Sequence, residues 1–282
     1  MAPVREGEYM IQTNGQSSAR LNFQHFWVEE CLGYLLHPNI PVSDNAKVAD
    51  IATGTGIWPI AYSRRVPSTV QVDGFDITDD MFPPADWLPS NVSLRTLDIL
   101  KPIPEELKGQ YDVVCIRYFG VLIKNNKPDF VLRNLVDMLK PGGYIQWVEA
   151  DIYNQRVVES ARYTLSSPTT LEQHLQGWQK YLDSSELRYD WLKTLPDICK
   201  SIGMSEANLY IPEILPAYRF TASTLVLGAW EEMTYKCLDE RPDEFLGTGS
   251  ELREKIAGFR KEVDQGAGLD LDYYVTVARK WA

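Results

Sequence analysis

The chain has 282 residues, 44% of them hydrophobic and 24% charged, a composition that suits a single globular domain with a sizeable core. Its formal net charge of −11 disfavours nucleic acid and anionic membranes as partners, because both carry negative charge. The four cysteines form no Cys-x-x-Cys pair, and no apolar stretch approaches the roughly 18 residues of a membrane span. We therefore expect a cytoplasmic protein without a metal site that binds a small molecule, either as a monomer or as a homodimer.

Hydrophobic patterns predict alternating strands and helices through the first half of the chain. A polar arm precedes a helix from Ser18 to His37 and a loop over residues 39–46. The expected strands are Lys47–Ala52, Val70–Ile77, Val92–Ile99, Tyr111–Tyr118 and Tyr144–Ala150, with helices at Ile57–Val66 and Pro128–Lys140 and a tight turn at Pro141-Gly142-Gly143. Because helical crossovers join successive strands, this pattern predicts a parallel α/β sheet with right-handed connections.

The pattern becomes mostly helical after Asp151. Helices are expected around 168–183, 188–202, 222–239 and 250–264, with a weak strand near 208–214 and a final strand at Leu271–Ala278. We divide the single domain, residues 1–282, into an N-terminal arm and helix (1–38), a ligand-binding core (39–151), a mostly helical lid with late sheet elements (152–270), and the last strand and tail (271–282). The lid precedes the last strand, so we expect it to cover the sheet's ligand-binding edge.

The most informative segment is Thr53-Gly54-Thr55-Gly56, between a strand and a helix. Glycines there let the backbone turn tightly and let a ligand lie against the main chain at the helix N-terminus. A dinucleotide fingerprint needs a small residue three positions after Gly56, where this chain has Pro59. Asp50, in the preceding strand, would repel a pyrophosphate but can hold an ammonium group. The loop therefore predicts S-adenosylmethionine rather than a nicotinamide cofactor.

Side chains at the ends of the next strands fit the same cofactor. Asp76 comes twenty positions after Gly56, a spacing at which a carboxylate can accept hydrogen bonds from both ribose hydroxyls. Asp98 is placed to accept a hydrogen bond from the adenine amine. We expect Ile77, Ile99 and Met81 to make apolar contacts to the adenine ring. Arg117 and Tyr118 are expected to lie beside the sulfonium as its polar neighbours.

With these motifs the chain resembles class I S-adenosylmethionine-dependent methyltransferases, and within them the fungal secondary-metabolite methyltransferases that include the gliotoxin-type thiomethyltransferases. The resemblance lies in Arg20–His25, Ala49–Trp58, Gly74–Ile77 and Leu139–Trp147. It implies a Rossmann-like seven-stranded sheet with helices on both faces, an N-terminal helical arm over the cofactor, and a helical lid inserted before the last strand.

Carried over from that family, the cofactor contacts are the glycine loop, the strand-end acids and the early arm and helix. They add Ala52, Thr53 and Gly54 and, from the arm and first helix, Tyr9, Arg20 and Gln24. Ala52 departs from the family pattern, which has its first glycine there, and its methyl group slightly crowds the turn.

Methyl transfer is an in-line displacement, so the enzyme's main task is to hold the acceptor in line with the methyl group. A base is needed only where the nucleophile must lose a proton. The candidate catalytic residues are His25, on the helix over the cofactor, and His174, on a lid helix. Glu149 and Asp151, which follow the fifth strand, could bind substrate or a divalent ion. The lid tryptophans Trp178 and Trp230 are possible substrate contacts.

The leading hypothesis is a methyltransferase that acts on sulfur, nitrogen or oxygen of a small secondary metabolite, with thiols slightly preferred, and that releases S-adenosylhomocysteine. Two alternatives stay open. Relatives of the fungal group include cyclases that use the bound sulfonium as a fixed charge, and others act as non-catalytic regulators of secondary metabolism. S-Adenosylhomocysteine formation separates the methyltransferase from both. Nicotinamide-dependent oxidoreduction is disfavoured by Pro59.

Overall fold

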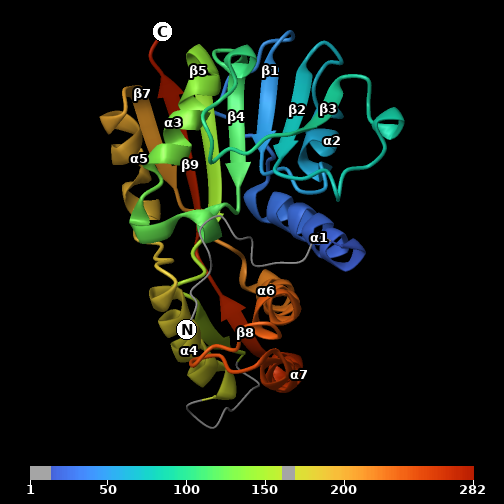
Figure 1. Cartoon of the computed structure of the whole chain (residues 1–282), viewed down its shortest axis with the longest axis vertical. Coiled ribbons are helices and arrows are strands. Elements are labelled where there is room, and N and C mark those ends of the chain that lie inside the picture. Colours follow the sequence, from blue (N-terminus) through green and yellow to red (C-terminus); the bar gives the residue numbers. More distant parts are fainter. Residues whose placement is uncertain (1–13, 161–168) are drawn as a thin grey trace.

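A computed structural model describes residues 14–160 and 169–282. Its main sheet has seven strands in the order β3-β2-β1-β4-β5-β9-β7 (Figure 1). β1 to β5 are parallel, whereas β9 runs antiparallel to both β5 and β7. The strands are β1 (Lys47–Ile51), β2 (Gln71–Asp76), β3 (Val92–Thr96), β4 (Tyr111–Arg117), β5 (Leu139–Ala150), β7 (Met204–Tyr210) and β9 (Tyr273–Lys280). The predicted Rossmann-like seven-stranded sheet is confirmed.

Alternating side chains of the strands pack against different helices, as the period of two in a strand requires. In β1, Val48 belongs to a core formed with α1 (Gly15–Leu32) and α2 (Ile57–Ser63). Ala49 and Ile51 belong to a core on the other face, formed with α3 (Asp129–Met138) and α5 (Trp191–Ser201). The helices therefore cover both faces of the sheet.

A second packing unit, which we call the helical cluster, lies beyond the carboxyl ends of the parallel strands (Figure 1). It consists of α4 (Thr170–Ser184), α6 (Arg219–Met233), the π-helical turn Thr234–Leu238, α7 (Gly249–Gln265) and the antiparallel pair β6 (Arg156–Glu159) and β8 (Ala267–Asp270). Its core contains Trp178, Trp230 and Phe259. Capping boxes at Thr169 and Thr248 fix the first turns of α4 and α7 by satisfying free backbone N–H groups.

Several boundaries differ from those predicted. β3 ends at Thr96, so Asp98 lies in the loop after the strand. β5 begins at Leu139 and includes the expected turn at Pro141–Gly143, with an irregular register against β4. α5 packs on the sheet rather than in the helical cluster, and the small β6–β8 sheet was not predicted. Short 3-10 helices occupy Ala85–Trp87, Glu105–Leu107, Gly120–Leu122, Lys124–Asn126 and Pro216–Tyr218.

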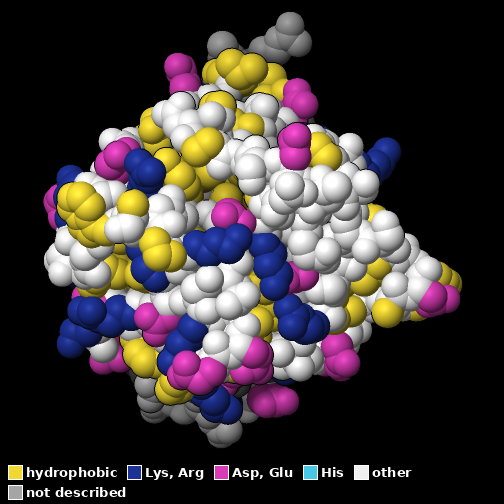
Figure 2. Space-filling model, turned by 90° about the horizontal axis from the view of Figure 1, so that it is seen from above, with side chains coloured by type: hydrophobic (Ala, Val, Ile, Leu, Met, Phe, Trp, Pro, Cys, Tyr) yellow, Lys and Arg dark blue, Asp and Glu magenta, His cyan; other side chains and the backbone are white. Residues whose placement is uncertain are grey.

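Figure 2 shows the opposite end of the molecule, where the parallel strands begin and where Lys and Arg side chains gather in a band. Part of this charge is paired at that end, for example Lys140 with Asp112 at the start of β4 (2.7 Å). In the two described ranges, no helix combines the length and apolar character that crossing a membrane requires.

Candidate active site

The loop after β1 lies at the centre of the carboxyl edge and has an unusual backbone. Ala52, Gly54 and Gly56 adopt positive φ angles of 55°, 61° and 74°. A Cβ atom added at Gly56 would stand 2.6 Å from the Leu94 side chain, so this position accepts glycine alone without rearrangement. At Gly54 the only neighbour within 4 Å of such an atom is Leu21, at 3.6 Å. The loop therefore presents bare main chain to the space beside it.

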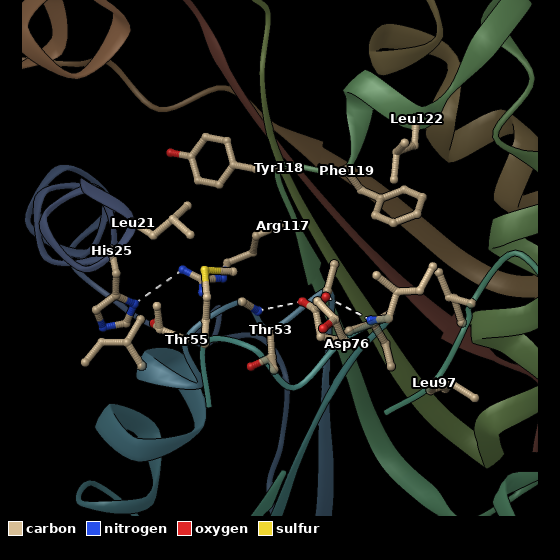
Figure 3. Close-up of a pocket in the computed structure, with 18 of the residues that line it drawn as sticks. Leu21, His25, Thr53, Thr55, Asp76, Leu97, Arg117, Tyr118, Phe119 and Leu122 are labelled. Carbon is tan, nitrogen blue, oxygen red and sulfur yellow. Dashed lines mark hydrogen bonds between the residues drawn. The ribbon is translucent and has the colours of Figure 1, made fainter. Parts of the chain in front are cut away.

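Asp76, at the end of β2, is fixed by two backbone hydrogen bonds. The N–H of Gly54 donates to its Oδ2 (2.7 Å) and the N–H of Ile77 donates to its Oδ1 (2.8 Å), as Figure 3 shows. Burial raises the pKa of Asp76, while these N–H groups act in the opposite direction. Both oxygens retain lone pairs for further donors. The side chain is thus a pre-oriented acceptor at the edge of the loop.

A cavity of about 200 Å³, the first cavity, opens beside this loop (Figure 3). Eleven of the predicted cofactor contacts line it: Gln24, Ala52, Thr53, Gly54, Asp76, Ile77, Met81, Asp98, Ile99, Arg117 and Tyr118. Asp98 does so from the loop after β3, where its Oδ1 accepts the N–H of Leu100 (3.0 Å). Residues from four strand ends and from α1 therefore converge on one space.

Two of the remaining predicted contacts lie elsewhere, and the third cannot be placed. Tyr9 is outside the described residues. Arg20 lines a different cavity, because a two-point ion pair with Glu232 of α6 (2.8 and 3.1 Å) holds its guanidinium there. Asp50 lies behind the first cavity and accepts a hydrogen bond from the Thr53 hydroxyl (2.7 Å). Neither Arg20 nor Asp50 lines the first cavity, and the cofactor contacts expected of them, which for Asp50 can run through water, stay predictions.

A second cavity of about 150 Å³ adjoins the first, sharing Leu21, Gln24 and Tyr118 with it. Its remaining wall is mostly apolar. It comes from α1, from the end of β5 and the loops after β4 and β5, from α4 and α6, from Tyr189 before α5, and from Leu271 and Tyr273 before and at the start of β9. Trp178 and Trp230, the lid tryptophans of the sequence analysis, both line it, as does Glu149 at the end of β5. Asp151 does not. The two cavities together form a site with a polar half and an aromatic half.

Part of the chain is similar to a known family. Residues 48–143, about a third of the chain, match the methyltransferase domain family. The chain is 36% identical to methyltransferase grgD of a Penicillium species over 155 residues, and 32% identical to N-methyltransferase verN of Clonostachys rogersoniana over 142 residues. These alignments cover 52% and 50% of this chain, and 54% and 50% of the relatives. The chain thus spans about half the length of these curated relatives.

Residues 48–143 are thus similar to methyltransferase domains, and fungal methyltransferases are similar to this chain over about half of its length. Over a longer alignment, N-methyltransferase sirN of Leptosphaeria maculans is 24% identical across 92% of this chain and 90% of its own length. The putative methyltransferase in complex with the Haloferax volcanii Trm112 activator has the same fold, with a TM-score of 0.54 at 16% identity, and the match covers 95% of both chains. S-Adenosylmethionine is the cofactor of such domains.

The polar groups of the first cavity fit this cofactor. Arg117 Nε and Asp50 Oδ1 are buried without hydrogen-bond partners and lie 3.9 Å apart. Burial raises the pKa of Asp50 to about 6, against the opposing effects of Arg117 and Thr53. A guanidinium with a free N–H suits the carboxylate end of an amino acid, whereas the Asp76 carboxylate suits vicinal hydroxyls. In the methyltransferase domain, Asp50 orients Thr53 and faces Arg117.

His25 lines the first cavity but has the wrong setting for a base at neutral pH. Its Nδ1 lies 3.4 Å from Arg117 Nη1 (Figure 3), and its ring is only 2% exposed. Burial, with the charges of Arg117 and Arg65, lowers its pKa to about 3. The imidazole therefore stays neutral and holds a proton weakly. It is also absent from the second cavity's lining, so we assign it a structural role beside Arg117.

His174 lies on α4, outside the residues that match the methyltransferase domain family. Its ring packs between Trp230 (4.6 Å between centroids) and Phe259 (5.0 Å) in the core of the helical cluster. It lines neither cavity. The sequence pattern predicted that His174 lies on a helix but did not show which face of the helix it occupies. In the structure its side chain faces the core of the helical cluster.

The sequence analysis missed most of the second cavity. Trp27, Tyr189 and Tyr273 contribute aromatic surface from three distant parts of the chain, and none of them belongs to a motif. In the first cavity most of the missed residues are apolar, such as Leu21, Phe119 and Leu122, whereas Thr55 and Thr78 are polar. A signal existed for Phe119, which directly follows the predicted Arg117-Tyr118 pair at the end of β4.

Proposed function

We propose that this chain transfers a methyl group from S-adenosylmethionine to a small-molecule acceptor held in the second cavity. The observation that carries the proposal is the junction of the two cavities at Leu21, Gln24 and Tyr118. A cofactor in the first cavity and an acceptor in the second would meet at these three residues. When bound, S-adenosylmethionine supplies a methyl group on a positively charged sulfur.

The chain's own residues contribute position and exclusion of water. Asp76 and the main chain at Gly54 would fix the nucleoside, and Arg117 the amino-acid end. The aromatic wall of the second cavity would hold a flat or apolar acceptor away from water, and displacement at a cationic centre disperses charge, so a dry site does not oppose it. Holding the two reactants in line accounts for much of the acceleration that such a site can provide.

The names of the relatives bear on the acceptor atom. verN and sirN are named N-methyltransferases, whereas the sequence analysis gave slight preference to a thiol. We propose a secondary-metabolite acceptor, with nitrogen in first place. A regulator named LAE1 in Hypocrea atroviridis is 24% identical over 148 residues, which keeps a non-catalytic role as the second candidate.

The proposal is tested by following an isotope label from the methyl group of S-adenosylmethionine into the products. The protein is incubated with this cofactor and organic extracts of fungal cultures, and label in extractable products is compared with the S-adenosylhomocysteine formed. We expect the two to appear in equal amounts. An altered product without S-adenosylhomocysteine would indicate a cyclase, and cofactor binding without any turnover would favour the regulator.

A further inference from the structure

Glu149 is a buried carboxylate that has no ion pair with the described residues. Its side chain is only 3% exposed and lines the second cavity. The N–H of Gly120 donates to Oε2 (2.7 Å) and the N–H of Ala150 to Oε1 (3.3 Å). Among the described residues, no Lys, Arg or His nitrogen lies within 4 Å of it. The backbone N–H groups of Gly120 and Ala150 orient this carboxylate, and its oxygens keep lone pairs for further donors.

The only cation of the same cavity among the described residues is already neutralised. Arg20 is bound to Glu232 through both Nε and Nη2, and its Nη1 donates to Gln24 Oε1 (2.9 Å). The charges of this ion pair cancel at the cavity wall. The carboxylate of Glu149 therefore remains the uncompensated charge that an acceptor meets.

Aromatic rings form much of the remaining wall. They belong to Trp27, Trp178, Trp230, Tyr118, Tyr189 and Tyr273. Trp178 and Trp230 lie with centroids 5.5 Å apart at an angle of 51°, and the Trp178 indole is fixed by a hydrogen bond to the carbonyl of Ile152 (2.8 Å). The faces of such rings attract cations. An aromatic wall combined with an unpaired carboxylate is a site for an organic ammonium group.

We propose that the acceptor presents a protonated amine to Glu149, and that Glu149 accepts a proton from it before the nitrogen attacks. This inference rests on the proposed function and names its substrate class. An N–H bond of the ammonium breaks and an O–H bond forms on the carboxylate. The freed nitrogen lone pair then forms the C–N bond while the C–S bond breaks, and the sulfur keeps the electron pair. The proton on Glu149 leaves to solvent after release of the methylated ammonium product.

Two physical arguments favour an amine over a thiol or a phenol. Burial raises the pKa of Glu149 to about 7, which brings its proton affinity closer to that of an amine. A thiol or phenol that loses its proton becomes an anion, which the nearby electron-rich rings and the carboxylate would disfavour. An amine becomes neutral in the same step, and its ion pair with Glu149 is converted into a neutral pair.

The first test compares ligands of matched shape and different charge. Calorimetry on protein saturated with S-adenosylhomocysteine measures binding of 2-phenylethylamine, 2-phenylethanol and phenylacetate. We expect the amine to bind roughly tenfold more tightly than the alcohol, on the scale of a desolvated cation–π and ionic contact, and phenylacetate to bind most weakly. Glu149→Gln, which keeps an acceptor for the Gly120 N–H, should reduce the amine's advantage to less than threefold.

Glu206→Gln is the matched control, because Glu206 lies on β7 with an exposed side chain. It should leave all three affinities unchanged. Equal affinity of amine and alcohol in the wild type, or an amine advantage that survives Glu149→Gln, would overturn the proposal. If the wild type does not bind S-adenosylhomocysteine, the cofactor assignment is wrong. Failure of the proposed function can therefore be distinguished from failure of the amine proposal.

A second measurement needs no variant. From pH 6 to pH 8 the amine stays protonated while Glu149 ionises, so amine affinity should rise severalfold and alcohol affinity should not. Burial raises the pKa values of the facing tyrosines Tyr118, Tyr189 and Tyr273, and burial keeps His25 neutral, so none of these groups titrates in this range. Parallel pH profiles for amine and alcohol would contradict the assignment. For any amine acceptor identified by label transfer, Glu149→Gln should lower kcat by about 100-fold with S-adenosylhomocysteine affinity retained.

Discussion

The two cavities are built in different ways. The first is formed mainly by residues at the ends of neighbouring parallel strands and in the loops that follow them, with Gly54 and Asp76 joined by a hydrogen bond. The second is formed by side chains from helices far apart in the sequence, as the contact between Arg20 and Glu232 across 212 positions illustrates. A cofactor used throughout a family suits the former, and an acceptor that differs between members suits the latter. Specificity can therefore change without altering the cofactor half.

The largest expected effect concerns the long-range contact of the acceptor half. Arg20→Met leaves Glu232 buried (3% exposed) and without its cation, so the free energy of unfolding should fall by about 3–5 kcal/mol. The double variant Arg20→Met/Glu232→Leu should recover most of this loss, because it removes the buried charge as well. Denaturant unfolding monitored by circular dichroism measures both. A loss below about 1 kcal/mol for the single variant would mean that the ion pair does not hold α1 to α6.

The next prediction addresses the cofactor half. Asp76→Ala removes the carboxylate that we propose as the acceptor for both ribose hydroxyls. Two hydrogen bonds to a charged group correspond to about 3 kcal/mol, or roughly 100-fold weaker S-adenosylhomocysteine binding. Calorimetric titration measures this. Asp79→Ala, an exposed carboxylate three positions later that lies outside the cavity lining, is the control and should bind normally. If Asp76→Ala stays within threefold of the wild type, the cofactor does not occupy the first cavity as described.

The difference in construction between the two cavities also explains which parts of the site could be predicted from the sequence. The loop after β1 and the side chain of Asp76 were predictable because strand ends and glycines fix main-chain geometry locally. Asp98 was expected to end its strand, and it lines the cavity from the loop beyond it. The surroundings of His174 and Arg20 were not predictable, because their neighbours, Phe259 and Glu232, come from helices that the local pattern cannot orient. The second cavity depends on such packing throughout.

A third prediction uses one titrating group from each half, since the two pKa shifts have opposite consequences. His25, with its pKa lowered to about 3, binds a proton more readily when unfolded, so it makes stability fall as the pH drops below about 6.5. Glu149, with its pKa raised to about 7, binds a proton more readily when folded, so it makes stability fall as the pH rises from about 4.5 to 7. Free energies of unfolding between pH 4 and pH 8 measure both slopes.

Each slope has a matched variant. His25→Gln should become more stable relative to the wild type as the pH is lowered, and Glu149→Gln should do so as the pH is raised from 5 to 7. Slopes that do not change would mean that the corresponding group keeps its ordinary pKa in the folded protein. If the relative stabilities of the two variants change with pH in opposite directions, the first cavity disfavours a positive charge at His25 and the second disfavours a negative charge at Glu149.

The smallest expected effect tests the main-chain geometry of the cofactor loop. Ala52 has a φ of 55°, a left-handed conformation that costs a residue with a Cβ atom about 1–2 kcal/mol. Ala52→Gly removes that cost but makes the unfolded chain more flexible, so the net gain in the free energy of unfolding should be about 0.5–1 kcal/mol. Ala61→Gly, within α2, is the control and should lose about 0.5–1 kcal/mol. Thermal unfolding of the two variants should therefore shift in opposite directions from the wild type. If Ala52→Gly destabilises the protein as Ala61→Gly does, the loop does not hold residue 52 in the left-handed region, and the main-chain account of the cofactor half fails at that position.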